Sequence, residues 1–162
     1  MTNNDVLRRL RYTFDFDDDR MIAIFGLGGA PVTRAQVSDW LKRDDDPAFQ
    51  ECSDEVLATF LDGFITLKRG KQEGPRPAPE KRLNNNIILR KLRIALSYRD
   101  DDMLEVLHRA GMPLTKTELS AFFRKPDHKH YRACQDQILR RFLQGLQAKY
   151  RGEGGAQGGD CA

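Results

Sequence analysis

The chain has 162 residues, of which 31% are charged and 40% are hydrophobic, and its formal net charge at pH 7 is +3. Its longest nearly apolar stretch, Met21–Val32, is too short and too rich in glycine to cross a bilayer, and Met1–Asp5 lacks the basic and apolar segments of a signal peptide. These features argue against a membrane-embedded or exported protein, and we expect a cytoplasmic protein without a membrane partner.

The chain contains an internal duplication. Residues Asn3–Gly70 align with Asn85–Gly152 at a constant offset of 82 without a gap, and 22 of the 68 aligned positions are identical. Unrelated sequences of this composition would share only about four. We therefore divide the chain into repeat 1 (3–70), a connector with glycine and proline (71–84), repeat 2 (85–152) and a glycine-rich tail (153–162) that we expect to be disordered.

The first two helices of each repeat are expected to begin at shared polar residues. Asn3 and Asn4, like their counterparts in repeat 2, precede apolar residues at helical spacing, so an asparagine side chain should cap the first helix. The second helix should begin at an aspartate run, because carboxylates stabilise the positive end of a helix dipole, and should end at Gly28.

The third helix of each repeat is predicted by a capping box, in which Thr33 precedes Gln36 and Thr115 precedes Glu118 by three residues. The fourth helix carries apolar residues at i, i+1, i+4, i+5 and i+8 in both repeats.

A glycine interrupts the apolar pattern of the fourth helix at Gly63 and again at Gly145. An interior helix glycine costs about 1 kcal/mol relative to alanine, so its presence in both copies predicts that another backbone packs closely there. Neither repeat shows sustained alternation of apolar and polar residues, which predicts an all-α fold with about four helices in each repeat. Because a unit of this size buries a thin core, we expect the two pseudo-symmetric repeats to pack together.

The two repeats carry opposite charge. Repeat 1 has 9 cationic and 13 acidic side chains, whereas repeat 2 has 14 and 7, so their net charges are −4 and +7. Unpaired cations of this kind are what phosphate binding requires. The candidate anion or nucleic-acid surface of repeat 2 consists of Arg90, Lys91, Arg93, Lys116, Arg124, Lys125, Lys129, Arg132, Arg140 and Arg141.

A helix-turn-helix is one way in which repeat 2 could read DNA. The turn Gly111–Pro113 lies between two expected helices and would place Lys116 near a groove. However, Leu119 and Phe122 are needed for the core, and the connection Pro126–Cys134 is longer than the usual tight turn. We therefore favour a solvated charged surface over specific DNA recognition.

Some of the shared charges have a simpler structural use. Both partners of an arginine–aspartate pairing recur in the two copies, which favours ion pairs between the first helix and the start of the second. The residues concerned are Arg8, Arg11, Arg90 and Arg93, with Asp18, Asp19, Asp100 and Asp101.

One cluster has the residue types of a metal site. His128, His130 and Cys134 follow the spacing H-x-H-x3-C, which matches no standard zinc finger, and repeat 1 has no histidine at the equivalent positions. We favour an exposed basic loop with a buried Cys134 over a metal site. Cys52 is the counterpart of Cys134 and Cys161 lies in the tail, so we expect two buried free thiols and no disulfide framework.

No catalytic constellation is visible in the sequence. The glycines after position 25 follow an expected helix and not a strand, so they do not form a phosphate-cradling loop. The chain has no serine elbow, and His108 aligns with Gly26 of the other repeat. We expect a protein that is not an enzyme and that holds no cofactor.

Three motifs together connect the chain to a known family. They are N-N-x-x-L-R-x-L-R in both repeats, Arg82–Asn86 at the junction, and Pro126–Lys129 followed by Arg132-x-Cys134. With them, about Thr2–Arg151 resembles the YehS-like bacterial proteins, which are built from two copies of a domain of unknown function. The resemblance implies a bacterial cytoplasmic protein with a duplicated domain, and it implies no activity, substrate or catalytic residue.

These observations predict a non-enzymatic interaction module. Its helical scaffold would present an acidic and a basic face to protein partners, including other copies of the same chain. The alternative is a nucleic-acid-binding protein that uses the basic second repeat.

Overall fold

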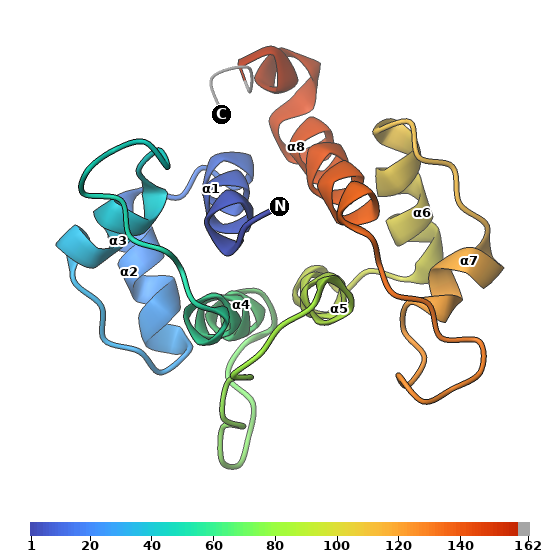
Figure 1. Cartoon of the computed structure of the whole chain (residues 1–162), viewed down its shortest axis with the longest axis horizontal. Helices are drawn as coiled ribbons and strands as arrows, with labels where there is room; N and C mark the ends of the chain where they lie inside the picture. Colours follow the sequence, from blue (N-terminus) through green and yellow to red (C-terminus); the bar gives the residue numbers. More distant parts are fainter. Residues whose placement is uncertain (159–162) are drawn as a thin grey trace. The chain divides into compact units, whose positions relative to one another are not determined.

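The structure is a computed structural model that describes residues 1–158, with side chains through residue 152. All regular structure in these residues is helical, in eight helices, and the chain divides into two compact units, Met1–Leu83 and Asn84–Ala162 (Figure 1). The predicted all-α fold with four helices in each repeat is confirmed. The packing of the two repeats against each other stays a prediction.

Repeat 1 is built around the pairing of its second and fourth helices. Aromatic side chains fill its centre, where the Phe25 ring lies 5.1 Å from that of Phe60 and 5.3 Å from that of Trp40. The helices are α1 (Asn3–Thr13), α2 (Asp18–Leu27), α3 (Arg34–Leu41) and α4 (Asp54–Arg69).

Repeat 2 has the same order of helices, but its third and fourth helices end differently from those of repeat 1. Its third helix stops before Phe122, which is still buried, and its fourth contains a non-helical residue, Gly152, with φ 70° and ψ 179°. The fourth helix is assigned as far as Gly158, past the start of the tail that we expected to be disordered, whereas residues 159–162, including Cys161, lie outside the described residues. The helices are α5 (Asn85–Leu96), α6 (Asp100–Arg109), α7 (Lys116–Ala121) and α8 (Asp136–Gly158).

The predicted close approach at the helix glycines is confirmed in both repeats. A Cβ atom on Gly63 of α4 would lie 1.8 Å from the carbonyl oxygen of Ile24 in α2. A Cβ atom on Gly145 of α8 would lie 2.0 Å from the carbonyl oxygen of Val106 in α6. Each repeat is therefore held together by one helix crossing at which only glycine fits.

Most of the predicted helix starts are confirmed. Asp17 caps α2, and capping boxes at Thr33 and Thr115 begin α3 and α7. The predicted capping by the shared asparagine pairs is wrong. Thr2 caps α1, and Asn84, which precedes the second pair, caps α5. The paired asparagines are instead used for contacts with a loop far along the chain.

Candidate anion-binding surface

The loop between the third and fourth helices has the same backbone course in both repeats. In repeat 1 the N–H of Asp46 donates to the carbonyl of Arg43 at 3.0 Å, and in repeat 2 the N–H of His128 donates to that of Lys125 at 2.9 Å. The following turn repeats the correspondence, three residues further on in each loop. Differences in side chains between the loops therefore stand on a common backbone.

A buried asparagine on the first helix anchors this loop in repeat 1. Asn4 is 2% exposed, and its amide nitrogen donates to the carbonyls of Trp40 and Gln50, each at 2.9 Å. Its amide oxygen accepts the N–H of Cys52 at 3.0 Å. Because these bonds occupy both donors and one lone pair of the amide, the buried group is satisfied and fixes the two ends of the loop.

Asn86 anchors the loop of repeat 2 in the same way. It donates to the carbonyls of Phe122 at 3.0 Å and Arg132 at 2.8 Å, and accepts the N–H of Cys134 at 2.8 Å. The neighbouring Asn85 donates to the carbonyl of Cys134 at 2.9 Å. The shared asparagine pair is thus a structural clamp for the loop.

Repeat 1 neutralises the cations around its loop with its own carboxylates. Arg8 forms ion pairs with Asp5 at 2.8 Å and Asp44 at 3.3 Å, and Lys42 forms one with Asp39 at 2.7 Å. Burial favours a higher pKa for Asp5, but hydrogen bonds from Thr2 and Arg8 outweigh it and lower this pKa. The positive charges of Arg8 and Lys42 are therefore neutralised by carboxylates of the same repeat.

Repeat 2 keeps the cations and lacks these carboxylates. Arg90 takes the place of Arg8, and its guanidinium donates at 3.4 Å to the carbonyl of Phe123. The five acidic residues Asp5, Asp39, Asp44, Asp46 and Glu51 are replaced by Ile87, Ala121, Pro126, His128 and Ala133. The segment 42–51 has two cations and four carboxylates, whereas 124–133 has four cations and one carboxylate, so their net charges are −2 and +3 with neutral histidines.

Arg93 and Lys116, which belong to the predicted surface, form ion pairs with aspartates of α6. Arg93 lies 2.9 Å from Asp100 and its guanidinium stacks 4.7 Å above the Phe123 ring, while Lys116 lies 3.3 Å from Asp101. These contacts assign both side chains to the fold of repeat 2. The Arg93–Asp100 pair was predicted from the sequence and is confirmed.

Other predicted cations lie on the helices. Arg140 and Arg141 are half-buried on α8, where they contact Gln137 at 3.5 Å and Gln144 at 3.2 Å. Lys91 is half-buried on α5.

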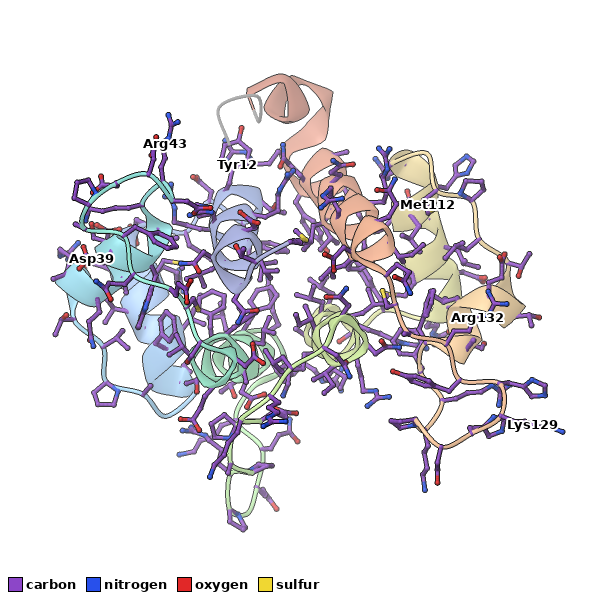
Figure 2. All side chains as sticks on the ribbon, viewed as in Figure 1. Tyr12, Asp39, Arg43, Met112, Lys129 and Arg132 are labelled. Carbon is purple, nitrogen blue, oxygen red and sulfur yellow. The ribbon has the colours of Figure 1, made fainter. Side chains whose placement is uncertain are left out.

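The remaining five cations define what we call the basic surface. All are exposed, and among the residues that the structure describes none of them forms an ion pair with a carboxylate. Figure 2 shows Lys129 on the outer part of the α7–α8 loop, with Arg132 on the chain returning toward α8. The basic surface consists of Arg90, Arg124, Lys125, Lys129 and Arg132.

Two exposed imidazoles lie within this loop. The His128 and His130 rings have centroids 5.6 Å apart, and Nδ1 of His128 accepts the N–H of His130 at 3.0 Å. In repeat 1 a carboxylate oxygen of Asp46 accepts the N–H of Ala48 at 2.8 Å. His128 therefore replaces Asp46 as the acceptor that stabilises the turn.

The thiol of the candidate metal cluster lies in the core of repeat 2. Cys134 is buried, and burial together with the charge of Asp136 raises its pKa to about 12. Burial raises the pKa of Cys52 to about 12 as well, so the prediction of two buried free thiols is confirmed. Within residues 1–158, no group of three or more His, Cys, Asp or Glu side chains is arranged to hold a metal ion.

The predicted ion pairs of the first aspartate run are wrong, because its partner lies on α3 and not on α1. Asp18 and Asp19 pair with Arg34 of α3, at 3.3 Å for Asp18. Arg8 pairs with other carboxylates, as described above, and not with this aspartate run. The aligned residue in repeat 2 is Lys116, and a basic residue at the same place in both copies was the signal that could have identified this partner.

Comparison with known proteins gives a family and a relative. The chain matches the family described as "Protein of unknown function (DUF1456)" twice, over residues 3–70 and 85–152. It is 45% identical over 150 residues to the uncharacterized protein YehS of Escherichia coli (strain K12), a match covering 92% of this chain and 96% of that protein. No solved structure matches the chain. Across the described helices, none is long and apolar enough to span a membrane.

Proposed function

We propose that this chain, which belongs to the DUF1456 family and contains two tandem copies of its domain, is a non-enzymatic interaction module. In this proposal the second repeat binds an anionic macromolecule. The basic surface is the binding face in this proposal. Repeat 1 is the same scaffold with that face closed by its own carboxylates. Repeat 1 has a net charge of −4 and would bind cationic partners.

One observation carries the proposal, which is the loss of carboxylates around cations that both repeats retain. Arg8 and Lys42 in repeat 1 are each within ion-pair distance of a carboxylate. Arg90 and Arg124 occupy the equivalent positions and have no such partner among the described residues. Exposed cations that form no ion pair can release counterions to a polyanion, which is the main source of such affinity.

The proposal assigns the chain no catalysis. A thiol with a pKa of about 12 stays protonated near neutral pH, so neither Cys52 nor Cys134 is an activated nucleophile. Free buried thiols are typical of proteins in reducing compartments, and the module would therefore act in the cytoplasm.

A salt series with a charge graft tests the proposal. Binding of the full chain to heparin, mixed DNA and RNA, and polyglutamate is measured by fluorescence anisotropy as salt rises. Five contacts of this kind give a slope of log K against log salt of about −3.5 for single strands and about −4.5 for duplex DNA. The variant Pro126→Asp/Ala133→Glu places two carboxylates of repeat 1 into repeat 2, and should reduce the affinity at low salt about tenfold or more.

The matched control adds the same charge to the other repeat. Pro47 and Ala48 are exposed in the loop of repeat 1, so Pro47→Glu/Ala48→Glu changes the net charge equally while leaving the basic surface intact. The control should bind like the unmodified chain. Absence of binding to every polyanion at low salt would rule the proposal out, and an equal loss in both variants would assign binding to net charge alone.

Self-association is a second candidate, favoured by the opposite charges of the repeats. Exposed carboxylates in 44–46 and the exposed cations of the basic surface could pair between two copies. Such a contact joins unlike surfaces and therefore forms chains or rings. Mass measurement at low and high salt separates the candidates, because a monomer at both leaves only a foreign partner.

A further inference from the structure

We infer that the anionic partner of the basic surface is single-stranded nucleic acid, with the imidazoles of His128 and His130 stacking against bases. This inference rests on the proposed function and adds the class of ligand. It concerns the α7–α8 loop between Arg124 and Arg132, in which the two histidines stand among four cations.

The two rings are not needed by the fold. Repeat 1 has Asp46 and Ala48 at the same positions and forms the same turn, with its N–H accepted by a carboxylate. In repeat 2 the His128 ring supplies the one acceptor that the turn requires, and the His130 ring contacts only the His128 ring among the interactions of the described residues. Their aromatic faces are therefore in excess of what the backbone uses.

Exposed rings between cations match the requirements of a single strand. Unpaired bases stack on aromatic side chains, while neighbouring cations follow the phosphates. Lys129 lies between the two histidines in sequence, and Lys125 and Arg132 flank them. All of these side chains are exposed. An acidic peptide would be attracted by the cations equally well but would make no use of the rings.

Duplex DNA fits this surface less well. The helix that a helix-turn-helix would insert into the major groove is α7, which has 6 residues and is about 9 Å long at 1.5 Å per residue. Leu119 on this helix is fully buried, and Lys116 is paired with Asp101 at 3.3 Å. Four of the five cations of the basic surface lie on the following loop, which suits a flexible strand better than a groove.

The test removes the rings and keeps the charges. His128→Asn retains a side-chain oxygen that can accept the N–H of residue 130, and His130→Ala removes a ring that accepts no hydrogen bond from the loop. Ala48→Asn is the control in repeat 1, because it changes the exposed residue aligned with His130 and leaves the charges and the rings of both loops unchanged. Circular dichroism and thermal midpoints verify that each variant is folded.

The expected result is a selective loss of affinity. Labelled single-stranded DNA and RNA of mixed sequence should bind the unmodified chain more tightly than duplex DNA or polyglutamate. Each ring removed should lower the single-strand affinity about five- to tenfold with an unchanged salt slope, and Ala48→Asn should have no effect.

The alternative outcomes separate this inference from the proposed function. Equal affinities of the ring variants and the unmodified chain would overturn the role of the rings, and preference for duplex or polyglutamate would overturn the ligand class. In both cases a loss of binding in Pro126→Asp/Ala133→Glu would still support the basic surface. Failure of every polyanion to bind would overturn both proposals.

Discussion

The α3–α4 and α7–α8 loops are the same structure with different electrostatics. Each is anchored by a buried asparagine, Asn4 or Asn86, that binds two carbonyls and one N–H. Each begins with two cationic residues directly after the third-helix region. In repeat 1 carboxylates occupy the surroundings of these cations, and in repeat 2 alanine, proline and histidine stand in their place.

The two loops therefore differ in the carboxylates around three shared cationic positions and in two further cations, Lys129 and Arg132, where repeat 1 has Pro47 and Gln50. A surface ion pair contributes little to stability, about 0 to 1 kcal/mol, so its carboxylate can be lost without unfolding the repeat. What changes is the electrostatic potential outside the loop. Scaffold and surface can therefore be tested separately, by substitutions that affect both repeats alike and by substitutions that exchange their surfaces.

The largest expected effect comes from the helix crossings that the two repeats share. In Gly63→Ala and Gly145→Ala the new Cβ would lie within about 2 Å of a carbonyl oxygen of the opposing helix. We expect each to lower the free energy of unfolding by about 3 kcal/mol, because the clash outweighs the gain in helix propensity. Urea unfolding is followed by circular dichroism, with the fluorescence of Trp40 as a specific signal for repeat 1.

Gly26→Ala is the control for these substitutions. Gly26 lies inside α2, and a Cβ atom added there would have no atom within 4 Å. This variant should be up to about 1 kcal/mol more stable than the unmodified chain. If Gly63→Ala and Gly145→Ala also increased stability, the close crossing would not be the constraint that the repeats share.

The next effect concerns the asparagine clamp. Asn86→Ala leaves the N–H of Cys134 and the carbonyls of Phe122 and Arg132 without the partner that the amide provides. We expect a loss of about 2 kcal/mol and faster hydrogen exchange at the N–H of Cys134, with the thiol becoming more reactive. Asn4→Ala should do the same to Cys52.

Asn85→Ala serves as the control for the clamp. Asn85 is half-buried and its amide reaches the carbonyl of Cys134 and the carboxylate of Asp136, so its loss is compensated more easily by water. Equal effects of the substitutions at positions 85 and 86 would mean that burial does not set the strength of the clamp.

The local features of this fold could be predicted from the sequence. The capping boxes at Thr33 and Thr115 involve residues three apart, so their signal is complete within one turn of helix. The glycines in α4 and α8 predicted a close contact for the same reason, since their cost is local. Their partners, Ile24 and Val106, are set by tertiary packing and have no sequence signal of their own.

The shared asparagines show where local propensity is misleading. Asparagine is a frequent helix cap, and a pair of them at a helix start was interpreted in that way. In the structure Asn4 lies within α1, after the helix start. Its side-chain amide donates to the carbonyl of Gln50, 46 residues away in sequence. Only the fold brings these groups together.

The sequence predicted which cations belong to the candidate surface, but it could not show which of them form ion pairs within the repeat. Arg93 and Lys116 carry the same formal charge as Lys129, yet they pair with aspartates of α6. The alignment of the repeats does contain the missing signal, because Asp39 and Asp44 of repeat 1 align with Ala121 and Pro126. Interpreting these changes required the knowledge that Asp39 and Asp44 are ion-pair partners.

The smallest expected effect is a transfer of binding to repeat 1, and it tests the comparison most directly. The variant Asp44→Pro/Asp46→His/Glu51→Ala gives segment 42–51 the residues that repeat 2 has at these three positions. It is made in the background of Pro126→Asp/Ala133→Glu, in which the basic surface is silenced. We expect about a tenfold gain in affinity for a polyanion over that background, with a salt slope of about −1 to −2, because Lys42 and Arg43 lose neighbouring carboxylates while Asp45 remains.

The gain should stay below the affinity of repeat 2, since positions 47 and 50 remain Pro47 and Gln50 and do not provide the cations of Lys129 and Arg132. Anisotropy titrations with heparin at low and high salt measure it. A variant that gains nothing would mean that removing carboxylates is insufficient, and that the added cations of repeat 2 carry the binding. A gain that survives Lys42→Gln/Arg43→Gln would place the contact elsewhere, because the retained cation pair is what the carboxylates of repeat 1 are proposed to silence.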